Sequence, residues 1–383
     1  MRPSASDGLF NREFNYMKKY AIIGSWDWDG TDTVKGVNTA AVNEKTGNLS
    51  RFRNYVPDVK SGCTAAVRDN IIYFTDEQKT LKGNANGGGG YLYAAEVSSQ
   101  GEIEIISQRP SLAVNPSYCT VDSTGRYLIA VHHGSSRNCA TKIRKENGRI
   151  ISEVVHDDAA AVLFELHADG TIGEAADAVF HEKEGRQSHL HSIYNVPDSG
   201  LLLICDKGLD CIYTYAVRRG KLVLKDTLSL PEGSDPRYGA FHPVLPLFYA
   251  NNEQRSVLYT VRFNKRTGKL KLIGETQLMD QPLIAMASDT VITADGKYLY
   301  TALRMADVIS VCSADEKGMP HLIGTIDAGG KNARGINLSR DGRFLYVCNT
   351  ESDVIAVFRI QPDGTLKKSR EIPCSRPANI RFL

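Results

Sequence analysis

Ionisable and hydroxyl side chains recur at two positions of a repeated strand pattern, and they are the residues with which this chain could do chemistry. Relative to the first residue of each repeated strand, the position eleven residues earlier holds Ser61, Ser117, His191, Arg237, Ser288 and Arg334. The position five residues later holds Asp27, Glu77, His133, Lys207, Glu253, Arg304 and Thr350. Arginine binds carboxylates and phosphates, and histidine or glutamate can transfer a proton. Such a set indicates acid–base chemistry on an anionic substrate.

Water-facing strand ends would explain the serines, the threonine and Glu77 of this set. Exposure of the strand ends to water accounts less well for basic, acidic and imidazole side chains that follow one another in consecutive repeats. They belong to His191, Arg237, Glu253, Arg304 and Arg334. We expect these five residues to meet at a concave mouth, where an anion would bind.

Two histidines separated by one residue add a candidate general base. His189 precedes His191 by two residues, so both side chains lie on the same face of a strand. One of the two could act as the general base while the other supports it, and we favour His189 as the base. His132 and His133 occupy the corresponding edge of the preceding repeat and are weaker candidates. We expect no metal, because three arginines at the same mouth would repel a dication.

No serine-nucleophile elbow, phosphate-binding P-loop or dinucleotide-binding glycine motif occurs in the sequence. Covalent serine chemistry and nucleotide binding are therefore disfavoured. The glycine cluster at residues 83–90 is expected to be a surface loop rather than a phosphate site.

Short apolar strands, repeated seven times, must position these residues. Their first residues are separated by 50, 56, 74, 46, 51 and 46 positions. Asp-Gly turns precede several of them, as at Asp295 and Asp341, and predict that each unit opens with a hairpin. A period near 50 residues with short strands is typical of four-stranded propeller blades. In a propeller the same edge of every inner hairpin meets at one mouth of the channel.

The two ends of the chain are expected to complete one blade. The first repeat, at Ile22, has no matching strand upstream, whereas residues 376–383 resemble an upstream strand without a follower. Pairing them would close the ring and remove an open sheet edge. The sequence thus predicts an all-β, seven-bladed β-propeller as a single domain over residues 19–383, preceded by a mobile lead-in at residues 1–18.

Composition excludes several classes of partner. The chain has 46 Lys and Arg against 44 Asp and Glu, a net charge of +2, so it has no basic excess for nucleic acid. Its apolar runs are much shorter than the roughly 20 residues of a membrane span. The first 20 residues show no secretory signal pattern, and the eight cysteines show no C-x-x-C spacing. We expect free thiols and a cytoplasmic protein.

The third repeat contains a surplus segment at residues 137–158, of mixed charge and with an apolar patch. The simplest interpretation is an ordinary blade insertion. The alternative is a lid or an oligomer contact.

At the polar positions of its repeats the chain resembles the seven-bladed lactonase propellers, the family of bacterial 6-phosphogluconolactonase and fungal carboxy-muconate cycloisomerase. The resemblance extends from about residue 19 to the C-terminus. The segments that carry it are 186–191 (RQSHLH), 206–210 (DKGLD), 235–237 (DPR), 252–253 (NE), Arg304 and 329–334 (GGKNAR).

The resemblance implies that His189, Arg237, Glu253 and Arg304 are the catalytic residues, because all four identities of the family's site are kept here. His191, Arg334, His133 and Lys207 are expected to bind the substrate. The chain departs from the family pattern beside the site, at Ser188, Lys207, Tyr238, Leu303 and Ala333.

The resemblance further implies a lactonase without metal or cofactor, most simply one that hydrolyses 6-phospho-D-glucono-1,5-lactone in the pentose phosphate pathway. His189 or Glu253 would be the base, and Arg237 and Arg304 would bind the oxyanion or an anionic group. One alternative is a cycloisomerase acting on a muconolactone, and another is a non-catalytic propeller that serves as an interaction platform. The expected partner is a small anionic lactone, and the expected state is a monomer or a weak homo-oligomer.

Overall fold

A computed structural model describes residues 20–26, 36–56, 59–61, 66–85, 87–280 and 285–383. The expected lead-in at residues 1–18, Asp27 and Cys63 lie outside these ranges. Among the described residues no helix is long and apolar enough to cross a bilayer.

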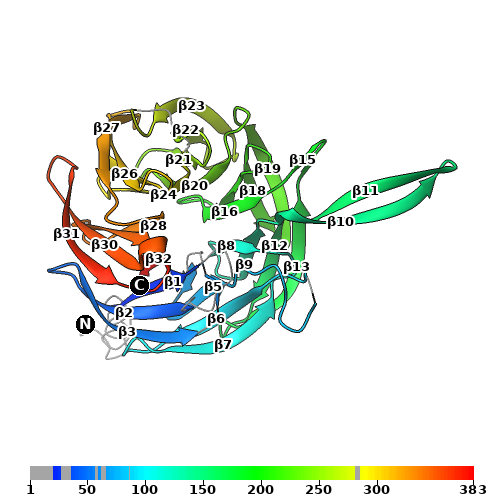
Figure 1. The fold of residues 1–383 in the computed structure, drawn as a ribbon, viewed down its shortest axis with the longest axis horizontal. Coiled ribbons are helices and arrows are strands. Elements are labelled where there is room, and N and C mark those ends of the chain that lie inside the picture. Colours follow the sequence, from blue (N-terminus) through cyan, green and yellow to red (C-terminus); the bar gives the residue numbers. More distant parts are fainter. Residues whose placement is uncertain (1–19, 27–35, 57–58, 62–65, 86, 281–284) are drawn as a thin grey trace, which may run out of the picture.

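Within this part of the chain the strands form seven four-stranded sheets around a central axis (Figure 1). The first sheet consists, from outside to inside, of β3 (Asn48–Val56), β2 (Val37–Asn43), β1 (Tyr20–Ser25) and β32 (Pro377–Phe382). The second consists, from inside to outside, of β4 (Ala66–Arg68), β5 (Ile71–Thr75), β6 (Tyr91–Val97) and β7 (Ile103–Pro110). The third consists of β8 (Pro116–Val121), β9 (Tyr127–His132), β12 (Ala160–Leu166) and β13 (Ile172–Phe180).

The remaining sheets follow the same order from inside to outside. The fourth consists of β16 (Leu190–Asn195), β17 (Leu201–Asp206), β18 (Cys211–Arg218) and β19 (Lys221–Ser229). The fifth consists of β20 (Pro236–Phe241), β21 (Leu247–Asn252), β22 (Val257–Phe263) and β23 (Leu270–Gln277). The sixth consists of β24 (Ala287–Ile292), β25 (Tyr298–Leu303), β26 (Val308–Ala314) and β27 (Pro320–Asp327). The seventh consists of β28 (Ala333–Leu338), β29 (Phe344–Asn349), β30 (Val354–Ile360) and β31 (Leu366–Pro373).

Two hairpins and one helical turn lie outside these sheets in the described ranges. The hairpin β10 (Ser135–Glu146) and β11 (Arg149–Asp157) is inserted between β9 and β12 of the third blade. A small hairpin pairs β14 (Glu182–Lys183) with β15 (Arg186–Gln187), and η2 (Thr350–Ser352) is one turn of 3₁₀ helix.

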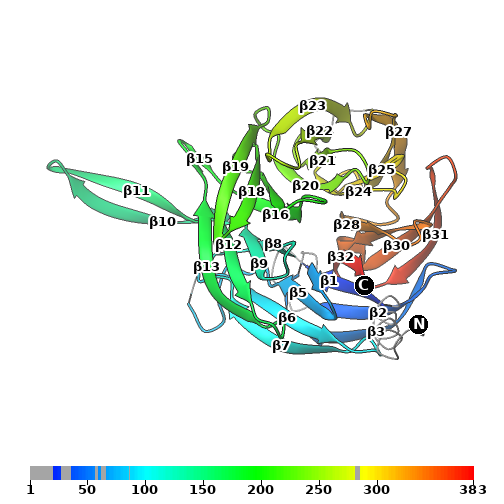
Figure 2. The same ribbon diagram turned by 180° about the vertical axis from the view of Figure 1, so that it is seen from behind.

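The ends of the chain close the ring, which confirms the predicted fold and its closure. β32 pairs antiparallel with β1, with Ala21 opposite Phe382 and Ile23 opposite Ile380. The C-terminal strand is thereby the inner strand of the first blade (Figure 2). The inner edge of β1 is thus satisfied by a strand from the far end of the sequence.

The core lies between neighbouring blades rather than within one of them. The second strand of each blade is covered on both faces, and β17 for example is buried along its whole length. Such strands have continuous apolar sequences, whereas the outer β27 alternates buried or half-buried residues with exposed ones. One apolar cluster joins Leu203 and Ile212 of the fourth blade to Phe248 and Tyr259 of the fifth.

The predicted pairing inside the hairpins is wrong by two residues. The position five residues after the start of a repeat bonds to the residue thirteen before it, as Glu253 N does to Asp235 O at 3.1 Å. Part of the difference is a β-bulge near the end of the inner strand. In the fifth blade Pro236 pairs with Asn252 and the pairing then shifts before Gly239.

Buried hydroxyl groups join neighbouring blades around the channel. Ser117 Oγ of the third blade donates to Leu190 O of the fourth at 3.0 Å, and Ser288 Oγ of the sixth donates to Ala333 O of the seventh at 2.7 Å. Thr350 makes the corresponding bond to the first blade. The interpretation of these residues as water-facing strand ends is therefore wrong, because they are buried blade-to-blade contacts.

The cysteines whose side chains are described are free thiols. They are Cys119, Cys205, Cys211, Cys312, Cys348 and Cys374, of which the first five are buried. Burial raises the pKa of Cys205 to about 12, so this thiol stays protonated and unreactive.

Ring closure predicts a strong dependence of stability on β32. Ile380 is 1% exposed and packs against the first and seventh blades, so Ile380→Ala should lower the free energy of unfolding by about 2–5 kcal/mol. Lys367→Ala, at an exposed position on the outer strand β31, is the control. Urea denaturation of both variants measures the difference, and equal midpoints would contradict the closure argument.

Candidate active site

A cavity of about 480 Å³ lies at one mouth of the channel, and each of the seven blades contributes to its lining. Its walls are mainly charged and imidazole side chains, with one indole and one thioether. The lining residues are Trp26, Lys60, Glu77, Asn115, His133, Gly134, Ser135, His191, Lys207, Arg237, Glu253, Gln254, Met286, Arg304 and Arg334.

Two local features of each blade place these side chains at the mouth. One set follows the second strand directly, as Lys207 follows β17 and Arg304 follows β25. The other set occupies the bulge of the inner strand, as His191 and Arg334 do in β16 and β28. A bulge inserts an unpaired residue and redirects its side chain. The repeated hairpin therefore brings both predicted positions to one edge.

Glu253 is the centre of a buried ion cluster. Its carboxylate is paired with Lys207 of the fourth blade and Arg304 of the sixth, and Arg237 Nε lies 3.8 Å from Oε1. Burial by itself raises the pKa of Glu253, but the charges of Lys207, Arg304 and Arg237 outweigh it and hold the pKa well below its usual range. Glu253 is therefore ionised at neutral pH and neutralises part of the charge around it.

Arg334 lies at the other side of the cavity, against an aromatic ring. Its guanidinium is 3.6 Å from the ring centre of Trp26, and Lys60 Nζ lies 4.6 Å from the same ring. Arg334 Nη2 is 4.0 Å from Glu77 Oε2. Burial and the neighbouring Arg237 lower the pKa of Arg334 to about 9, although Glu77 partly offsets them.

Two donors of this buried arginine have no acceptor in the described part of the chain. Arg334 Nε and Nη1 are inaccessible to solvent and make no hydrogen bond there. Native proteins rarely leave buried charged donors unpaired, because each costs free energy comparable to a lost hydrogen bond. A bound anion could supply an acceptor to these two donors, and Arg237 Nε likewise has no hydrogen-bond acceptor among the described residues.

Three histidines form a contiguous group on the third and fourth blades. The Nδ1–H of His189 donates to the carbonyl oxygen of His133 at 2.7 Å, and the two rings are stacked with centres 4.6 Å apart. His191 meets His133 edge to face at 5.6 Å. Burial lowers the pKa of His133 and of His191 well below the usual value, and the charges of Lys207 and Arg237 add to the effect. Both rings are neutral at neutral pH.

A buried carboxylate fixes the strand end that carries His189. Asp206 accepts hydrogen bonds from His189 N at 2.8 Å, from Ser188 Oγ at 2.7 Å and from Leu209 N at 3.2 Å. This carboxylate determines the position of the His189 backbone, while the carbonyl of His133 determines the tautomer of its ring. In the neutral ring the proton is on Nδ1 and Nε2 is the acceptor, with no hydrogen bond to it from the described residues.

Seven of the eight residues predicted from the sequence line the cavity, namely His133, His191, Lys207, Arg237, Glu253, Arg304 and Arg334. His189 is not among the lining residues; it is partly exposed and its ring is stacked on that of His133, which lines the cavity. Their chemical roles stay predictions.

Sequence reasoning missed Trp26, Lys60 and Asn115, and it assigned Glu77 to ordinary strand-end polarity although Glu77 lines the cavity. Trp26 lies one residue before the recurring position in the first repeat, so the period could have pointed to it. Lys60 and Asn115 lie in connections between blades, where no repeat pattern marks them.

Among the described residues no group of three or more His, Cys, Asp or Glu is arranged to hold a metal ion. Five basic side chains line the cavity beside two carboxylates, Glu77 and Glu253. This excess of positive charge suits an anion.

Comparison with known proteins gives a family match over almost the whole chain. The family model described as "Lactonase, 7-bladed beta-propeller" matches residues 21–382.

Individual relatives are distant. A 6-phosphogluconolactonase of Klebsiella pneumoniae (strain 342) is 26% identical over 285 residues, which cover 72% of this chain and 83% of that protein. A 6-phosphogluconolactonase of Bacillus subtilis is 22% identical over 302 residues, which cover 77% of this chain and 78% of that protein. The solved structure of a periplasmic gluconolactonase of Pseudomonas aeruginosa has a TM-score of 0.79 at 19% identity, with 95% of this chain and 98% of that chain covered.

His132, directly before the site residue His133, predicts a loss of stability in acid. It is fully buried, and burial lowers its pKa to about 4, while in the unfolded chain it titrates near 6.5. Between about pH 6.5 and about pH 4 the unfolded state binds more protons, so stability falls as the pH falls, by about 3 kcal/mol for this group.

The variant His132→Asn, whose amide can still donate to Ala160 O, should lose less stability than the wild type over that range. Urea denaturation at about pH 7.5 and about pH 5 measures this, with the exposed His321→Asn as control. A wild-type pH profile retained in His132→Asn would contradict the prediction.

Proposed function

We propose that this chain, which belongs to the lactonase family of seven-bladed β-propellers, hydrolyses the ring ester of an anionic sugar lactone, with 6-phospho-D-glucono-1,5-lactone as the first choice. The observation that supports the proposal most is Arg334, a buried cation that lines a cavity rich in positive charge and has two donors without an acceptor among the described residues. The names of the relatives from Klebsiella and Bacillus agree with this choice of substrate.

His189 is the general base in this proposal. Its Nδ1–H is engaged by the carbonyl of His133, so Nε2 can accept a proton from water. Glu253 is the weaker candidate, because Lys207 and Arg304 occupy its carboxylate and its pKa is lowered. An ion-paired carboxylate with a lowered pKa is a weak base at neutral pH.

Arg237 and Arg304 stabilise the negative charge that develops on the carbonyl oxygen. Both are buried and both reach Glu253, so their guanidinium groups are fixed before substrate binds. Arg237 is held further by a hydrogen bond from Nη1 to Ser288 O and by contact with the ring of Tyr238. Glu253 acts as a positioning residue for these two arginines.

The reaction balances with water alone. The water oxygen bonds to the lactone carbonyl carbon while His189 Nε2 takes its proton, which gives a tetrahedral oxyanion beside Arg237 and Arg304. The carbonyl reforms as the bond to the ring oxygen breaks, and His189 returns the proton to that oxygen. The product is the open aldonic acid, which ionises at neutral pH. Arg334 and Lys60 bind the phosphate at the opposite side of the cavity.

A lactone panel separates this proposal from its rivals. It should contain 6-phosphogluconolactone, unphosphorylated gluconolactone and a muconolactone, each with and without chelator. Hydrolysis of a sugar lactone that chelator leaves unchanged supports the proposal. Isomerisation, which consumes no water, indicates the cycloisomerase, and inactivity on every lactone favours the interaction platform.

Arg237→Lys keeps the positive charge but loses the planar, two-pronged donor group. Loss of one fixed oxyanion donor costs about 10²–10³ in kcat, so we expect a decrease of that order, close to that of Arg237→Ala. Steady-state kinetics on the phosphorylated lactone measure it, with Arg255→Lys outside the cavity as the matched control. Wild-type kcat in folded Arg237→Lys would remove Arg237 from this role.

Arg334→Met should affect binding rather than chemistry. A charge-assisted hydrogen bond to phosphate corresponds to about a tenfold or greater change in affinity, so KM for the phosphorylated lactone should rise by that factor while kcat changes little. KM for unphosphorylated gluconolactone should stay the same. An equal rise in both KM values would show that Arg334 does not bind the phosphate.

A further inference from the structure

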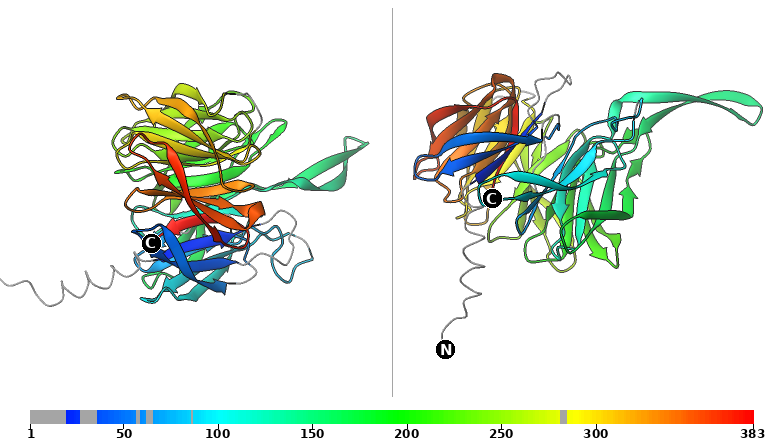
Figure 3. Two further views of the ribbon diagram at one scale, coloured as in Figure 1. Left: turned by 60° about the vertical axis from the view of Figure 1, so that its left-hand side comes forward. Right: turned by 90° about the horizontal axis from the view of Figure 1, so that it is seen from below.

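The hairpin of β10 and β11, called the arm below, lies outside the ring that it interrupts. It leaves the third blade and points away from the other blades in both face views and in both side views (Figure 3). β10 has 12 residues, which at about 3.3 Å per residue gives a reach of roughly 40 Å. An isolated two-stranded hairpin is marginally stable in water, so an arm of this length needs a covering surface.

One face of the arm carries three exposed apolar side chains, alongside Thr141, Lys145 and Ser152. Cross-strand pairing places Ile143 opposite Ser152 and Ile150 opposite Lys145, on the same face as Val154. Ile143 is 75% exposed, Ile150 77% and Val154 56%. The opposite face carries ion pairs, as between Arg144 and Glu153 at 3.2 Å. A contiguous exposed apolar face rimmed by charge is typical of a protein–protein contact.

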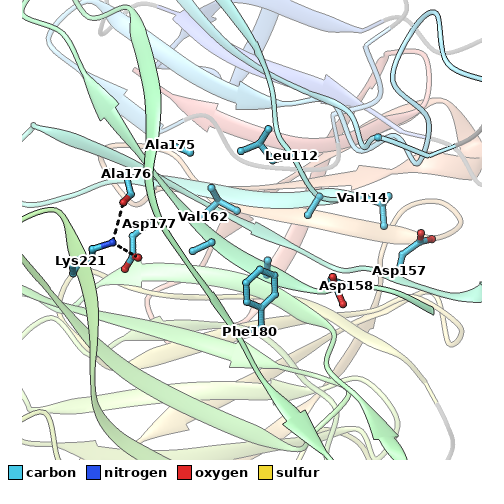
Figure 4. A pocket seen from close by; sticks show the side chains of 14 residues that line it. Leu112, Val114, Asp157, Asp158, Val162, Ala175, Ala176, Asp177, Phe180 and Lys221 are labelled. Carbon is cyan, nitrogen blue, oxygen red and sulfur yellow. Dashed lines mark hydrogen bonds and ion pairs between the residues drawn. The ribbon is translucent and has the colours of Figure 1, made fainter. Parts of the chain in front are cut away.

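A groove of about 560 Å³ lies at the root of the arm, against β12 and β13 (Figure 4). Its floor is apolar, with Val162, Leu112 and Phe180, and the last two are large side chains left 61% and 57% exposed. Asp157 and Asp158 lie toward one end of it in Figure 4, and Asp177, paired with Lys221 at 3.1 Å, lies toward the other.

The arm and the groove are complementary in polarity and in charge. Residues 140–156 contain four basic side chains, Lys142, Arg144, Lys145 and Arg149, and two acidic ones, Glu146 and Glu153. The arm thus has an excess of basic charge. At the ends of the groove Asp157 is paired with Lys79 at 3.1 Å and Asp177 with Lys221, so the third carboxylate, Asp158, leaves the groove with a small excess of acidic charge. Such a match favours docking of one on the other.

The arm cannot enter the groove of its own chain in this arrangement, because it starts at the groove's edge and points away from it. A second copy of the chain supplies both an arm and a groove. Two copies related by a twofold axis can each place an arm in the other's groove, so that every dimer contains the contact twice.

We propose that this protein forms a reciprocal homodimer in which the apolar face of each arm docks in the groove between β13 and the β7–β8 connection of the other copy. The arm is thereby covered, and Leu112 and Phe180 leave solvent. Gly134 and Ser135, at the start of the arm, are part of the cavity wall. Each arm–groove contact therefore lies close to the channel mouth of one copy.

Sedimentation velocity of the full chain between about 1 µM and about 100 µM tests this proposal. The wild type should be dimeric at the upper concentrations. The arm variant Ile143→Ser/Ile150→Ser and the groove variant Phe180→Ser should each raise the dimer dissociation constant by about tenfold per contact, hence about a hundredfold per dimer. Val244→Ser, an equally exposed apolar residue of the fifth blade, is the matched control and should change nothing.

Mixing the two variants decides whether the arm binds the groove. A heterodimer of arm variant and groove variant contains one wild-type contact, whereas either homodimer contains none, so mixing should restore dimers. Circular dichroism confirms that each variant is folded. A monomeric wild type, a dimer unchanged by either variant, or a mixture that stays monomeric would overturn the proposal.

Discussion

Several positive charges are buried together at the channel mouth, and the carboxylate of Glu253 offsets the free-energy cost of burying them. Lys207, Arg237 and Arg304 come from three different blades and all lie within reach of its carboxylate. Removing a charge from water costs several kcal/mol unless an opposite charge and hydrogen bonds compensate it. The carboxylate provides that compensation, and it also fixes where the two arginines point. Arg334 is farther from its carboxylate, Glu77, at 4.0 Å, and its Nε and Nη1 have no acceptor among the described residues, so its charge is less well compensated than the charges around Glu253.

The ring holds this arrangement rigid because the blades are joined where the site is. Hydroxyl groups of the inner strands bond from one blade to the next, as Ser288 does to Ala333, and the guanidinium of Arg237 itself bonds to the following blade. The site is therefore built from the same contacts that keep the channel closed. Preorganised groups of this kind lose little free energy on reorganisation when charge develops on a substrate.

Periodicity allowed the sequence to predict the blades, the closing strand and seven of the fifteen residues that line the cavity, because each blade repeats one hairpin and one polar edge. The period could not show the bulge that changes the pairing at Arg237, because a bulge leaves the apolar pattern intact. It could not identify Lys60, which lies between repeats, or the pairing of Arg334 with the ring of Trp26, which depends on contact between blades. The groove beside Phe180 could not be predicted either, because its walls come from separate elements. The extra segment in the third repeat predicted where the arm is inserted but not its structure.

Closure by β32 also determines the order in which this fold can be completed during synthesis. β1 is synthesised before the other strands of the ring, yet its inner partner β32 is synthesised after all of them. Throughout translation the first sheet presents an unpaired edge, and six blades can form before the ring can close. Unpaired edges in nascent chains are sites of misassembly and chaperone binding. The interval before β32 leaves the ribosome is therefore the period in which this fold is most exposed to aggregation.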